Sequence, residues 1–499
     1  MTVVNTNVAA LSAATSMMKN TKDMESAMAK LSSGYRINTA ADDAAGLSIS
    51  EKLEGQIRGT AMAVRNAQDA QNMIDTIEGA SAEIVTSLQR LRELAVQSAN
   101  STNSSVDRSF LQKEASQLLQ EIDRIAHQTQ FNGMNVLDGS FDDKNIQAGA
   151  NVNNSIAVDA ASMAAQDIGQ YVIRGQATDL AAAAAGADNA YAAGNIVLNG
   201  FAGTATVASS ANDTAREARD DINAIADKTG VTAKAATHVH LSAVSAAGTI
   251  QLTIGHNGAV GVGTDTATTV TATVSDTEDL TALRDAINNA AGSTGVTAKF
   301  FEGSTDELLL TDQDGDDIQL NNYTNGTATI TAQAYNFHGT SASAGGAATT
   351  VTSGGSADSI TIVGELVLGS SQAFSISNVT ATYFGATTSN QSSLENVGDI
   401  DIGSMAGAQK ALDRIDGAID MVNTQRAELG AMSNRLDKTI NNLTNVVENH
   451  SATKSHIKDA NFAQETSQLT KAQILNQAAT SMLAQANASK QTVLALLQN

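Results

Sequence analysis

Two adjacent carboxylates are the first candidates for chemistry in this chain. Asp42 and Asp43 lie in LSSGYRINTAADDAAGLSIS (residues 31–50), between two segments that are typical of helices. A pair of carboxylates can act as general acid and general base. Adjacent helix residues, however, point about 100° apart, so these two side chains do not converge on one reacting bond. The stretch therefore predicts a turn between two helices, with an aspartate near a helix start.

A second acidic group is found in TDQDGDD (residues 311–317), where four aspartates surround Gly315. Such a cluster is a candidate calcium site. The spacing of an EF-hand loop is not met, because the glycine is at the fourth position and no glutamate closes the loop. A turn between two strands is the favoured interpretation, since aspartate and glycine both suit turns.

The histidines His238, His240 and His256 could supply zinc ligands. A strand places both rings of the HVH motif on one face, but no third ligand is identifiable, so we expect a surface strand. The chain contains no H-E-x-x-H, G-x-x-x-x-G-K-[ST], G-x-G-x-x-G or G-x-S-x-G motif. The sequence therefore predicts no catalytic residue, no metal site and no cofactor, and a protein that is not an enzyme.

The composition excludes several other classes. The 499 residues include no proline and no cysteine, and the formal net charge is −23. The absence of proline suits long uninterrupted helices and strands, and the absence of cysteine excludes disulfides and thiol chemistry. Nucleic-acid binding needs dense Lys and Arg, which this chain lacks. No run reaches the ~18 apolar residues of a membrane span, so neither nucleic acid nor membrane is an expected partner.

Both ends of the chain carry apolar residues at alternating spacings of four and three, the pattern of helices that pair along a seam. The outermost seams are Val4, Val8, Leu11, Thr15 and Met18, and Leu475, Ala479, Met482, Ala486, Ser489, Val493 and Leu496. Two longer seams follow further in: Ala67, Ala70, Ile74, Ile77, Ser81, Ile84, Leu88, Leu91 and Ala95, and Ala408, Leu412, Ile415, Ile419, Val422, Arg426, Leu429, Ser433, Leu436, Ile440, Leu443 and Val447. A third helix is expected around Leu111, Leu118, Ile122 and Ile125.

The middle of the chain has a different texture. Between about residues 140 and 400, short alternating runs such as GTIQLTIG, SITIVGELVLG and FSISNVTATYF predict strands. Upstream of this part, Asn132-Gly133 and Asp138-Gly139 predict the tight turns of a hairpin. INAIADKTGVTAKA (residues 222–235) recurs as INNAAGSTGVTAKF (residues 287–300), an offset of 65 residues. We therefore expect two related helix-plus-strand modules, at about residues 190–257 and 258–322.

Together these patterns predict an α+β fold, with terminal long-helix coiled-coil or bundle domains and a β-rich central insert. Neither terminal seam can stay exposed, and each is best buried against the other. The chain should run out along helices, form an outer lobe and return beside its outgoing part.

The two ends resemble those of bacterial flagellins. The N-terminal motifs are LSSGYRINTAADDAAGLSIS, SLQRLRELAVQSANSTNS and EIDRIAHQTQFNGMNVLDGS, and the C-terminal match runs from MSNRLDKTINNLTNVVENH to QTVLALLQN. The resemblance covers roughly residues 1–175 and 400–499. It implies three layers in a filament: residues 1–42 with 455–499 as inner-tube helices, residues 43–175 with 400–454 as a helical rod with a β-hairpin, and residues 176–399 as an outer surface domain.

A flagellin polymerises through contacts that repeat without closing, which gives an open helical fibre for swimming. On this view Arg36, Asn38, Asp42 and Asp43 form a spoke of polar contacts within and between subunits. The assembly seam would comprise Val4, Val8, Leu11, Leu475, Met482, Val493 and Leu496. Since one subunit alone cannot bury this seam, we expect the terminal segments to be disordered in the free monomer and to order on assembly.

The resemblance also implies partners. These are further copies of the chain, a secretion chaperone on the last helix (residues 471–498), and the filament cap and hook-associated junction proteins. Arg90, Leu94, Gln97 and Glu114 match the patch that a host innate receptor reads in many flagellins, although their segment is otherwise expected to be a solvated helix face. The Ser- and Thr-rich stretch at residues 340–359 is either flexible loop or a site of O-linked glycans.

The expected location is extracellular, in the flagellar filament. The first cation is Lys19, so the N-terminus is a poor match to a cleaved signal peptide and export through the flagellar type III exporter is implied. Two alternatives stay open: a hook–filament junction protein, which shares such terminal helices, and an extracellular enzyme displayed on a helical stalk. The second would need a competent site in residues 176–399, and none is identifiable there.

Overall fold

The computed structural model describes residues 6–179, 189, 191, 193–257, 267–301, 303–377, 382–384 and 389–497. Side chains are described for the same residues except 179, 256–257, 382, 389 and 490–497. The chain divides into two compact units. The first comprises Met1–Ile74, Asp143–Val158 and Ala431–Asn499, and the second comprises Asp75–Asp142 and Asp159–Gly430.

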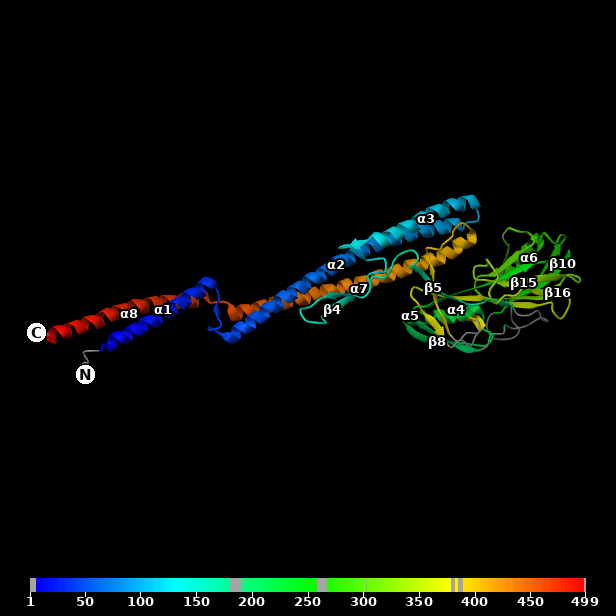
Figure 1. Cartoon of the computed structure of the whole chain (residues 1–499). Coiled ribbons are helices and arrows are strands. Elements are labelled where there is room, and N and C mark those ends of the chain that lie inside the picture. Colours follow the sequence, from blue (N-terminus) through cyan, green and yellow to red (C-terminus); the bar gives the residue numbers. More distant parts are fainter. Residues whose placement is uncertain are drawn as a thin grey trace. The chain divides into compact units, whose positions relative to one another are not determined.

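Five long helices are formed by the two ends of the chain (Figure 1): α1 (Val8–Ser33), α2 (Ala44–Ser98), α3 (Ser105–Gln128), α7 (Met405–Lys458) and α8 (Phe462–Leu497). The two seams predicted for α2 and α7 are confirmed. All nine seam residues from Ala67 to Ala95 are buried, and those from Ala408 to Val447 are buried or half-buried. Salt bridges flank the seam, from Arg92 to Asp416 and from Arg426 to Glu78 in the second unit.

In the first unit, α1 packs against α8, as the sequence predicts for the two ends of the chain. The stripe of α1 that faces α8 is a different one from the predicted stripe. It contains Ala10, Met17, Met24 and Ala27, whereas the side chains of Val8, Leu11 and Met18 are 65%, 64% and 67% exposed. Both stripes follow the same 4-3 spacing, so periodicity does not choose between them. The stripe with alanines lets the two helices approach more closely.

A helix cap begins α3, and a tight turn forms the hairpin that follows it. Ser104 and Asp107 form a reciprocal capping box at the start of α3. Strands β1 (Gln130–Phe131) and β2 (Met134–Asn135) pair across Asn132-Gly133, whose φ angles are 50° and 78°. These positive φ values confirm the predicted tight turn. A second hairpin, β3 (Lys144–Gln147) with β4 (Ser155–Val158), belongs to the first unit.

Three sheets make up the β-rich part of the second unit. One has the order β11-β10-β14-β17-β6, with β6 (Thr178–Asp179), β10 (Gly248–Asn257), β11 (Thr268–Val274), β14 (Asp317–Thr324) and β17 (Ile360–Val363). The second has the order β20-β19-β7-β8, with β7 (Gly194–Gly200), β8 (Gly203–Ser209), β19 (Ser375–Ser377) and β20 (Ser389–Gln391). In FSISNVTATYF only Ser375–Ser377 is a described strand, because Thr382–Phe384 forms the 3₁₀-helix η1 and residues 378–381 lie outside the described part.

The third and largest sheet has eight strands. Its order is β12-β13-β9-β18-β5-β21, and β15 joins β9 and carries β16. The strands are β5 (Gly169–Arg174), β9 (Thr232–Ser242), β12 (Thr297–Phe300), β13 (Leu308–Asp312), β15 (Thr329–Tyr335), β16 (Thr349–Thr352), β18 (Glu365–Ser370) and β21 (Ser393–Asn396). Strand β9 is central to this sheet, since it pairs with β13, β15 and β18.

The two GVTAK motifs occupy equivalent places in this part of the fold. In the first, α4 (Ala215–Asn223) and the short α5 (Ala226–Thr229) lead into β9; in the second, α6 (Thr281–Thr294) leads into β12. The helices end at Gly230 and Gly295, whose φ angles are 73° and 70°. Each motif is preceded by a hairpin, β7–β8 or β10–β11. Both motifs thus combine a hairpin, a helix and a strand, although the hairpin of the second begins at Gly248, inside the range predicted for the first module.

An asparagine in each module connects its helix to its strand. Asn223 donates to Ala233 O at 3.0 Å and accepts from Ala233 N–H at 2.8 Å. Asn288 makes the same two hydrogen bonds with Ala298, at 2.9 and 2.8 Å. We call this pair of hydrogen bonds the asparagine clasp. It closes a loop of ten residues, so each module fixes its own helix-to-strand angle locally.

Candidate self-assembly surface

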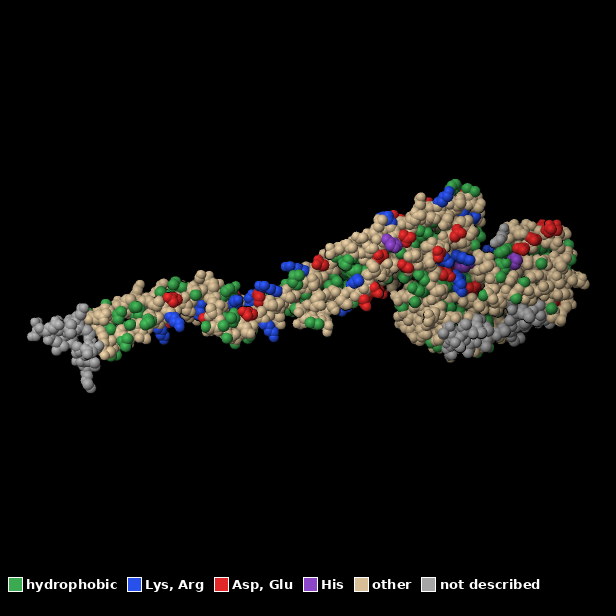
Figure 2. Space-filling view, in the orientation of Figure 1, with side chains coloured by type: hydrophobic (Ala, Val, Ile, Leu, Met, Phe, Trp, Pro, Cys, Tyr) green, Lys and Arg blue, Asp and Glu red, His purple; other side chains and the backbone are tan. Residues whose placement is uncertain are grey.

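Apolar side chains remain exposed along both helices of the α1–α8 pair. On α1 these are Val8, Leu11, Met18 and Met28, and on α8 they are Phe462, Ile474, Leu475 and Met482. Figure 2 shows hydrophobic side chains distributed along this helical part, between polar ones. Large apolar residues scattered singly on a surface need no explanation, but exposed apolar side chains that recur along both helices of one pair indicate an interaction surface. We call these eight side chains the apolar stripe.

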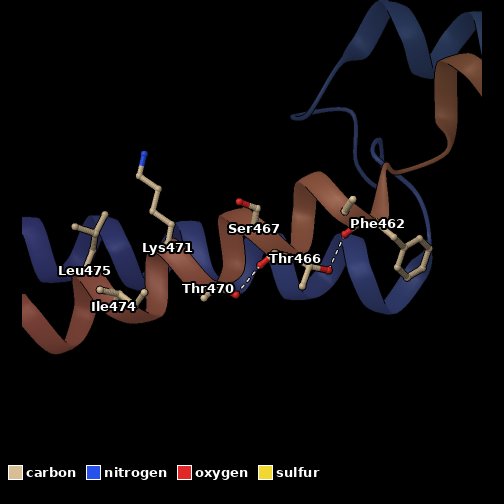
Figure 3. A pocket seen from close by; sticks show the side chains of 8 residues that line it. Phe462, Thr466, Ser467, Thr470, Lys471, Ile474 and Leu475 are labelled. Atoms are coloured by element: carbon tan, nitrogen blue, oxygen red, sulfur yellow. Dashed lines mark hydrogen bonds between the residues drawn. The ribbon is translucent and has the colours of Figure 1, made fainter.

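A shallow groove on α8 belongs to this surface (Figure 3). It has a volume of about 840 Å³ and is lined by Phe462, Ala463, Thr466, Ser467, Thr470, Lys471, Ile474 and Leu475. Two threonine hydroxyls donate to carbonyls of the preceding turn, Thr466 Oγ1 to Phe462 O at 2.6 Å and Thr470 Oγ1 to Thr466 O at 2.9 Å. Their hydroxyls are therefore satisfied within the helix. The groove presents mainly apolar groups to a partner.

The predicted assembly seam only partly coincides with this surface. Val8, Leu11, Leu475 and Met482 are exposed, as an assembly seam requires. Val4 lies outside the described residues, as do the side chains of Val493 and Leu496. Sequence reasoning missed Phe462, Thr466, Thr470 and Ile474. Their signal was a four-residue spacing along one helix face.

The predicted spoke lies between α1 and α2, and its two aspartates act on different backbone groups. Asp42 Oδ2 accepts hydrogen bonds from the N–H groups of Thr39 and Asn38, at 2.9 and 3.2 Å, and from the Thr39 hydroxyl. The Thr39 and Asn38 N–H groups lower the pKa of Asp42, so its charge stabilises the turn. Asp43 Oδ1 accepts from Gly46 N–H at 2.8 Å and thereby caps α2. The predicted turn with an aspartate at a helix start is confirmed.

Arg36 connects this turn to the C-terminal part of the chain. Its Nη2 donates to Ile457 O and its backbone N–H donates to Lys458 O, both at 2.7 Å. A cation is favourable at the end of α7, where helix carbonyls lack intrahelical partners. Asn38 makes only a local contact, from its Nδ2 to Tyr35 O at 3.4 Å. The four predicted spoke residues thus form a joint between chain segments, and the carboxylates converge on no common point.

The candidate receptor patch is partly accessible. Arg90 bridges two carboxylates, with Nη2 2.7 Å from Glu114 Oε1 and Nη1 2.8 Å from Glu93 Oε2. Hydrogen bonds to Glu93 and Glu114 raise the pKa of Arg90. Gln97 is exposed. Leu94 differs from expectation, because its side chain is only 1% exposed and faces the helix core together with Leu91. It therefore does not belong to the accessible surface of the single chain.

The acidic and histidine motifs are structural. Asp312 Oδ1 accepts from the N–H groups of Asp314 and Gly315, and the segment turns between β13 and β14, as predicted. His238 and His240 are buried, so the expected surface strand is wrong. His238 Nε2 lies 2.8 Å from Phe337 O, and burial lowers the pKa of His238 to about 4. The side chain of His256 lies outside the described part.

Two absences hold for the described part of the chain. No group of three or more His, Asp or Glu side chains there is arranged to hold a metal ion. No helix formed by the described residues is both long and apolar enough to cross a membrane.

Long paired terminal helices, an apolar stripe left open on that pair and a β-rich central part define a class of self-associating structural proteins. The comparisons give the family. The bacterial flagellin N-terminal helical region matches residues 4–142, the bacterial flagellin C-terminal helical region matches residues 412–497, and the flagellin hook IN motif matches residues 195–255. This chain belongs to the bacterial flagellin family.

Relatives cover nearly the whole chain. B-type flagellin of Pseudomonas aeruginosa is 36% identical, and flagellin of Salmonella rubislaw and flagellin A of Vibrio anguillarum are each 34% identical, with 99% of this chain and 99% of each relative covered. Among solved structures, FliC from Burkholderia pseudomallei is 20% identical over 73% of this chain and 99% of its own, with a TM-score of 0.29. The flagellar junction protein FlgL from Legionella pneumophila is 13% identical over 82% of this chain and 100% of its own, with a TM-score of 0.34. The family assignment therefore rests on the sequence relatives.

Proposed function

We propose that this chain is the structural subunit that polymerises into the extracellular flagellar filament and serves swimming motility. The observation that carries the proposal is the open apolar stripe on α1 and α8 in a member of the flagellin family. The alternative of a hook–filament junction protein is less supported, because relatives that match 99% of the chain at 31–36% identity are flagellins. The displayed-enzyme alternative gains no support from the described central residues.

Burial of the stripe supplies the driving force for assembly. Each exposed Val, Leu or Met side chain gains about 1.5–3 kcal/mol when it is fully buried. A contact between two different faces of the same chain produces an open fibre when its repetition does not close into a ring. We propose that residues 1–42 with 455–499 form the inner tube, residues 43–175 with 400–454 the rod layer, and residues 176–399 the outward face.

The spoke residues have a defined part in this proposal. Arg36 and Asp42 hold the joint together within the chain through hydrogen bonds to backbone groups. Both side chains are also exposed, so they are able to contact a neighbouring subunit. We propose that the joint sets the angle between the inner tube and the rod layer.

We further propose partners besides the chain itself. The groove on α8 is the surface that a secretion chaperone would cover before passage through the flagellar exporter, because free apolar stripes promote aggregation. The filament cap and hook-associated junction proteins would contact the terminal helices at the two ends of the fibre. Arg90, Gln97 and Glu114 offer an accessible polar patch for a host innate receptor.

Fibre formation tests the function directly. The purified full chain is expected to form long fibres after desalting, visible by negative-stain microscopy. Leu11→Asp with Met482→Asp should prevent fibres, because two charges would have to be buried without partners. Phe201→Asp is the matched control, since Phe201 is an exposed apolar residue of the central part and is 50% exposed.

Two results would contradict the proposal. One is an unsubstituted chain that remains in discrete particles under fibre-promoting conditions. The other is an equal fibre yield from the chain and from the Leu11→Asp, Met482→Asp variant.

A further inference from the structure

The apolar residues between α1 and α8 do not by themselves fix how the two helices align. Ala472, Ala479 and Ala486 are spaced by seven residues on α8, and Met17 and Met24 are spaced by seven on α1. A slip of one heptad moves a helix by about 10 Å, at 1.5 Å per residue. After such a slip alanine occupies the place of alanine again. Apolar packing therefore leaves several registers close in energy.

Three polar contacts cross this seam. Asn7 Nδ2 donates to Ala486 O at 3.1 Å, Asn476 Nδ2 donates to Thr21 Oγ1 at 2.9 Å, and Lys30 Nζ lies 3.9 Å from Glu465 Oε1. The residue numbers rise along α1 as they fall along α8, as an antiparallel pair requires. The contacts are distributed from one end of the pair to the other.

The two contacts between side chains, Asn476–Thr21 and Lys30–Glu465, are lost when the helices slip by one heptad. The Asn7 contact is to a backbone carbonyl and does not distinguish the registers. In one direction Asn476 would face Ala14 instead of Thr21, and Glu465 would face Asp23 instead of Lys30. In the other direction Asn476 would face Met28, and Lys30 would face Ala472. Asn476 is half-buried and Glu465 is buried. A buried polar group without its partner costs about 1–3 kcal/mol, so the full cost applies to Glu465 and part of it to Asn476.

The contact between Lys30 and Glu465 is especially sensitive to the register of the two helices. Its side chain is buried, and its Oε2 has no hydrogen-bond partner among the described residues. Lys30 is the cation paired with it in the native register. A register that removes Lys30 leaves a buried carboxylate uncompensated.

We propose that the Thr21–Asn476 contact, with Lys30–Glu465 as a second layer, determines the register of the terminal helix pair. A polar residue at a seam position specifies register at a cost in stability. The register in turn aligns Leu11 and Met18 on α1 with Ile474 and Met482 on α8, so it defines the stripe that neighbouring subunits bury. The inference rests on the proposed function, because the stripe is used in the fibre.

Disulfide cross-linking in assembled fibres measures the register. The chain has no cysteine, so introduced pairs report without background. Met24→Cys with Ala472→Cys reports the native register, and Met17→Cys with Ala472→Cys reports a slip of one heptad. We expect the first pair to form its intramolecular disulfide at least about tenfold faster, since one lost hydrogen bond of about 1.4 kcal/mol already changes a ratio tenfold.

The decisive variant is Thr21→Leu with Asn476→Leu, which keeps the seam apolar and removes the polar layer. The ratio of the two cross-linking rates should fall about tenfold from its value in the parent, while the remaining Lys30–Glu465 contact still favours the native register. Leu469→Met with Leu483→Met is the matched control, because it changes two seam residues and leaves every polar contact; its ratio should stay at the parent value. The swapped variant Thr21→Asn with Asn476→Thr should restore the native ratio.

The outcomes separate the inference from the function. Fibres of Thr21→Leu, Asn476→Leu that keep the full ratio would overturn the inference alone. If this variant forms no fibres, the swapped variant decides: native fibres and native ratio support the inference, and their absence overturns it. An unsubstituted chain without fibres would instead contradict the proposed function.

Discussion

Gly46 is the clearest single position at which the geometry reverses an ordinary rule. Glycine inside a helix normally costs about 1 kcal/mol relative to alanine. At Gly46, however, an added Cβ would collide with the Asp43 carboxylate and lie 2.8 Å from Ile37 Cδ1. Ile37 is buried and Asp43 is the cap of α2. Glycine is therefore required here by close packing.

Gly46→Ala should lower the free energy of unfolding by about 1–2 kcal/mol, because the cap is displaced and the turn is overpacked. Gly55→Ala is the control on the same helix, since a Cβ there meets no atom within 4 Å. It should raise stability by about 0.5–1 kcal/mol. Guanidinium unfolding of the monomer, followed by helical circular dichroism, measures both. Equal effects of the two substitutions would contradict the assigned packing.

Glu365 gives the molecule a titrating group in its interior. The side chain is buried at the start of β18, its Oε2 accepts from Phe337 N–H at 2.7 Å, and burial raises its pKa from 4.5 to about 7. The folded chain thus binds a proton that the unfolded chain releases between these pH values. The contribution of Glu365 to stability is fully present below pH 4.5 and is lost as the pH rises to about 7.

Glu365→Gln should remove this dependence. At pH 8 the variant should be more stable than the parent by up to about 3 kcal/mol, and the two should converge near pH 4. His238 has the opposite slope, because its lowered pKa makes stability rise between about pH 4 and 6.5. The difference between the two chains cancels the His238 contribution. Thermal melting across pH 4–8 is the measurement, and a difference that does not vary with pH would contradict the assignment.

At the scale of elements, α2 and α7 were predictable because each carries one long apolar seam. From Ala67 to Ala95 every seam position is small or aliphatic, and the large apolar residues outside the seam in this stretch are Met73, Val85 and Leu94. The pairing of α1 with α8 was predictable, but the stripe of α1 that faces α8 was not. Helix α1 has two apolar stripes of equal spacing, and the choice depends on how closely α8 approaches. That information is absent from one helix alone.

The HVH motif shows a second limit. Side chains alternate between the two faces of a strand, so the motif predicts one face exposed to solvent. Strand β9, however, is paired on both edges, and its residues are buried continuously from Ala235 to Leu241. The segment around Phe337 covers the histidine face, with His238 Nε2 near its carbonyl. This cover comes from a part of the chain about 100 residues away. No local pattern around His238 could reveal it.

The asparagine of the clasp is at the same position in both copies of the repeat, at Asn223 and Asn288. Its contribution to the stability of each module can be tested by substitution. Asn288→Ala should destabilise its module by about 1–2 kcal/mol, since two hydrogen bonds to Ala298 are lost. Asn223→Ala should have a similar effect on the first module. Asn289→Ala is the control, because Asn289 is exposed on the same helix. Urea unfolding of the three variants measures the effects, and a control as destabilising as Asn288→Ala would argue against the clasp.

At the scale of the whole molecule, the terminal helix pair is poorly buried for its length. Helix α1 has 26 residues, and Ala27 is its one buried residue. Ordering a residue costs about 1–2 kcal/mol in backbone entropy, which so little burial does not offset. We therefore expect this pair to be ordered only when neighbouring subunits add further burial.

Hydrogen exchange should consequently differ between the two assembly states. Residues 6–30 and 470–489 should exchange rapidly in the monomer and become strongly protected in fibres. The seam from Ala67 to Ala95 is the internal control and should be protected in both states. Strong protection of the terminal segments in the monomer would show that the pair is stable without neighbours.

The asparagine clasp has a consequence for how such chains change over evolutionary time. Because it closes over ten residues, a duplicated copy of a module brings its own closure with it. Such chains are therefore free to gain a module as far as this closure is concerned, whereas loss of the first module would also remove β9 from its pairing with β13, β15 and β18. The terminal helices, which must fit copies of themselves, have no comparable freedom.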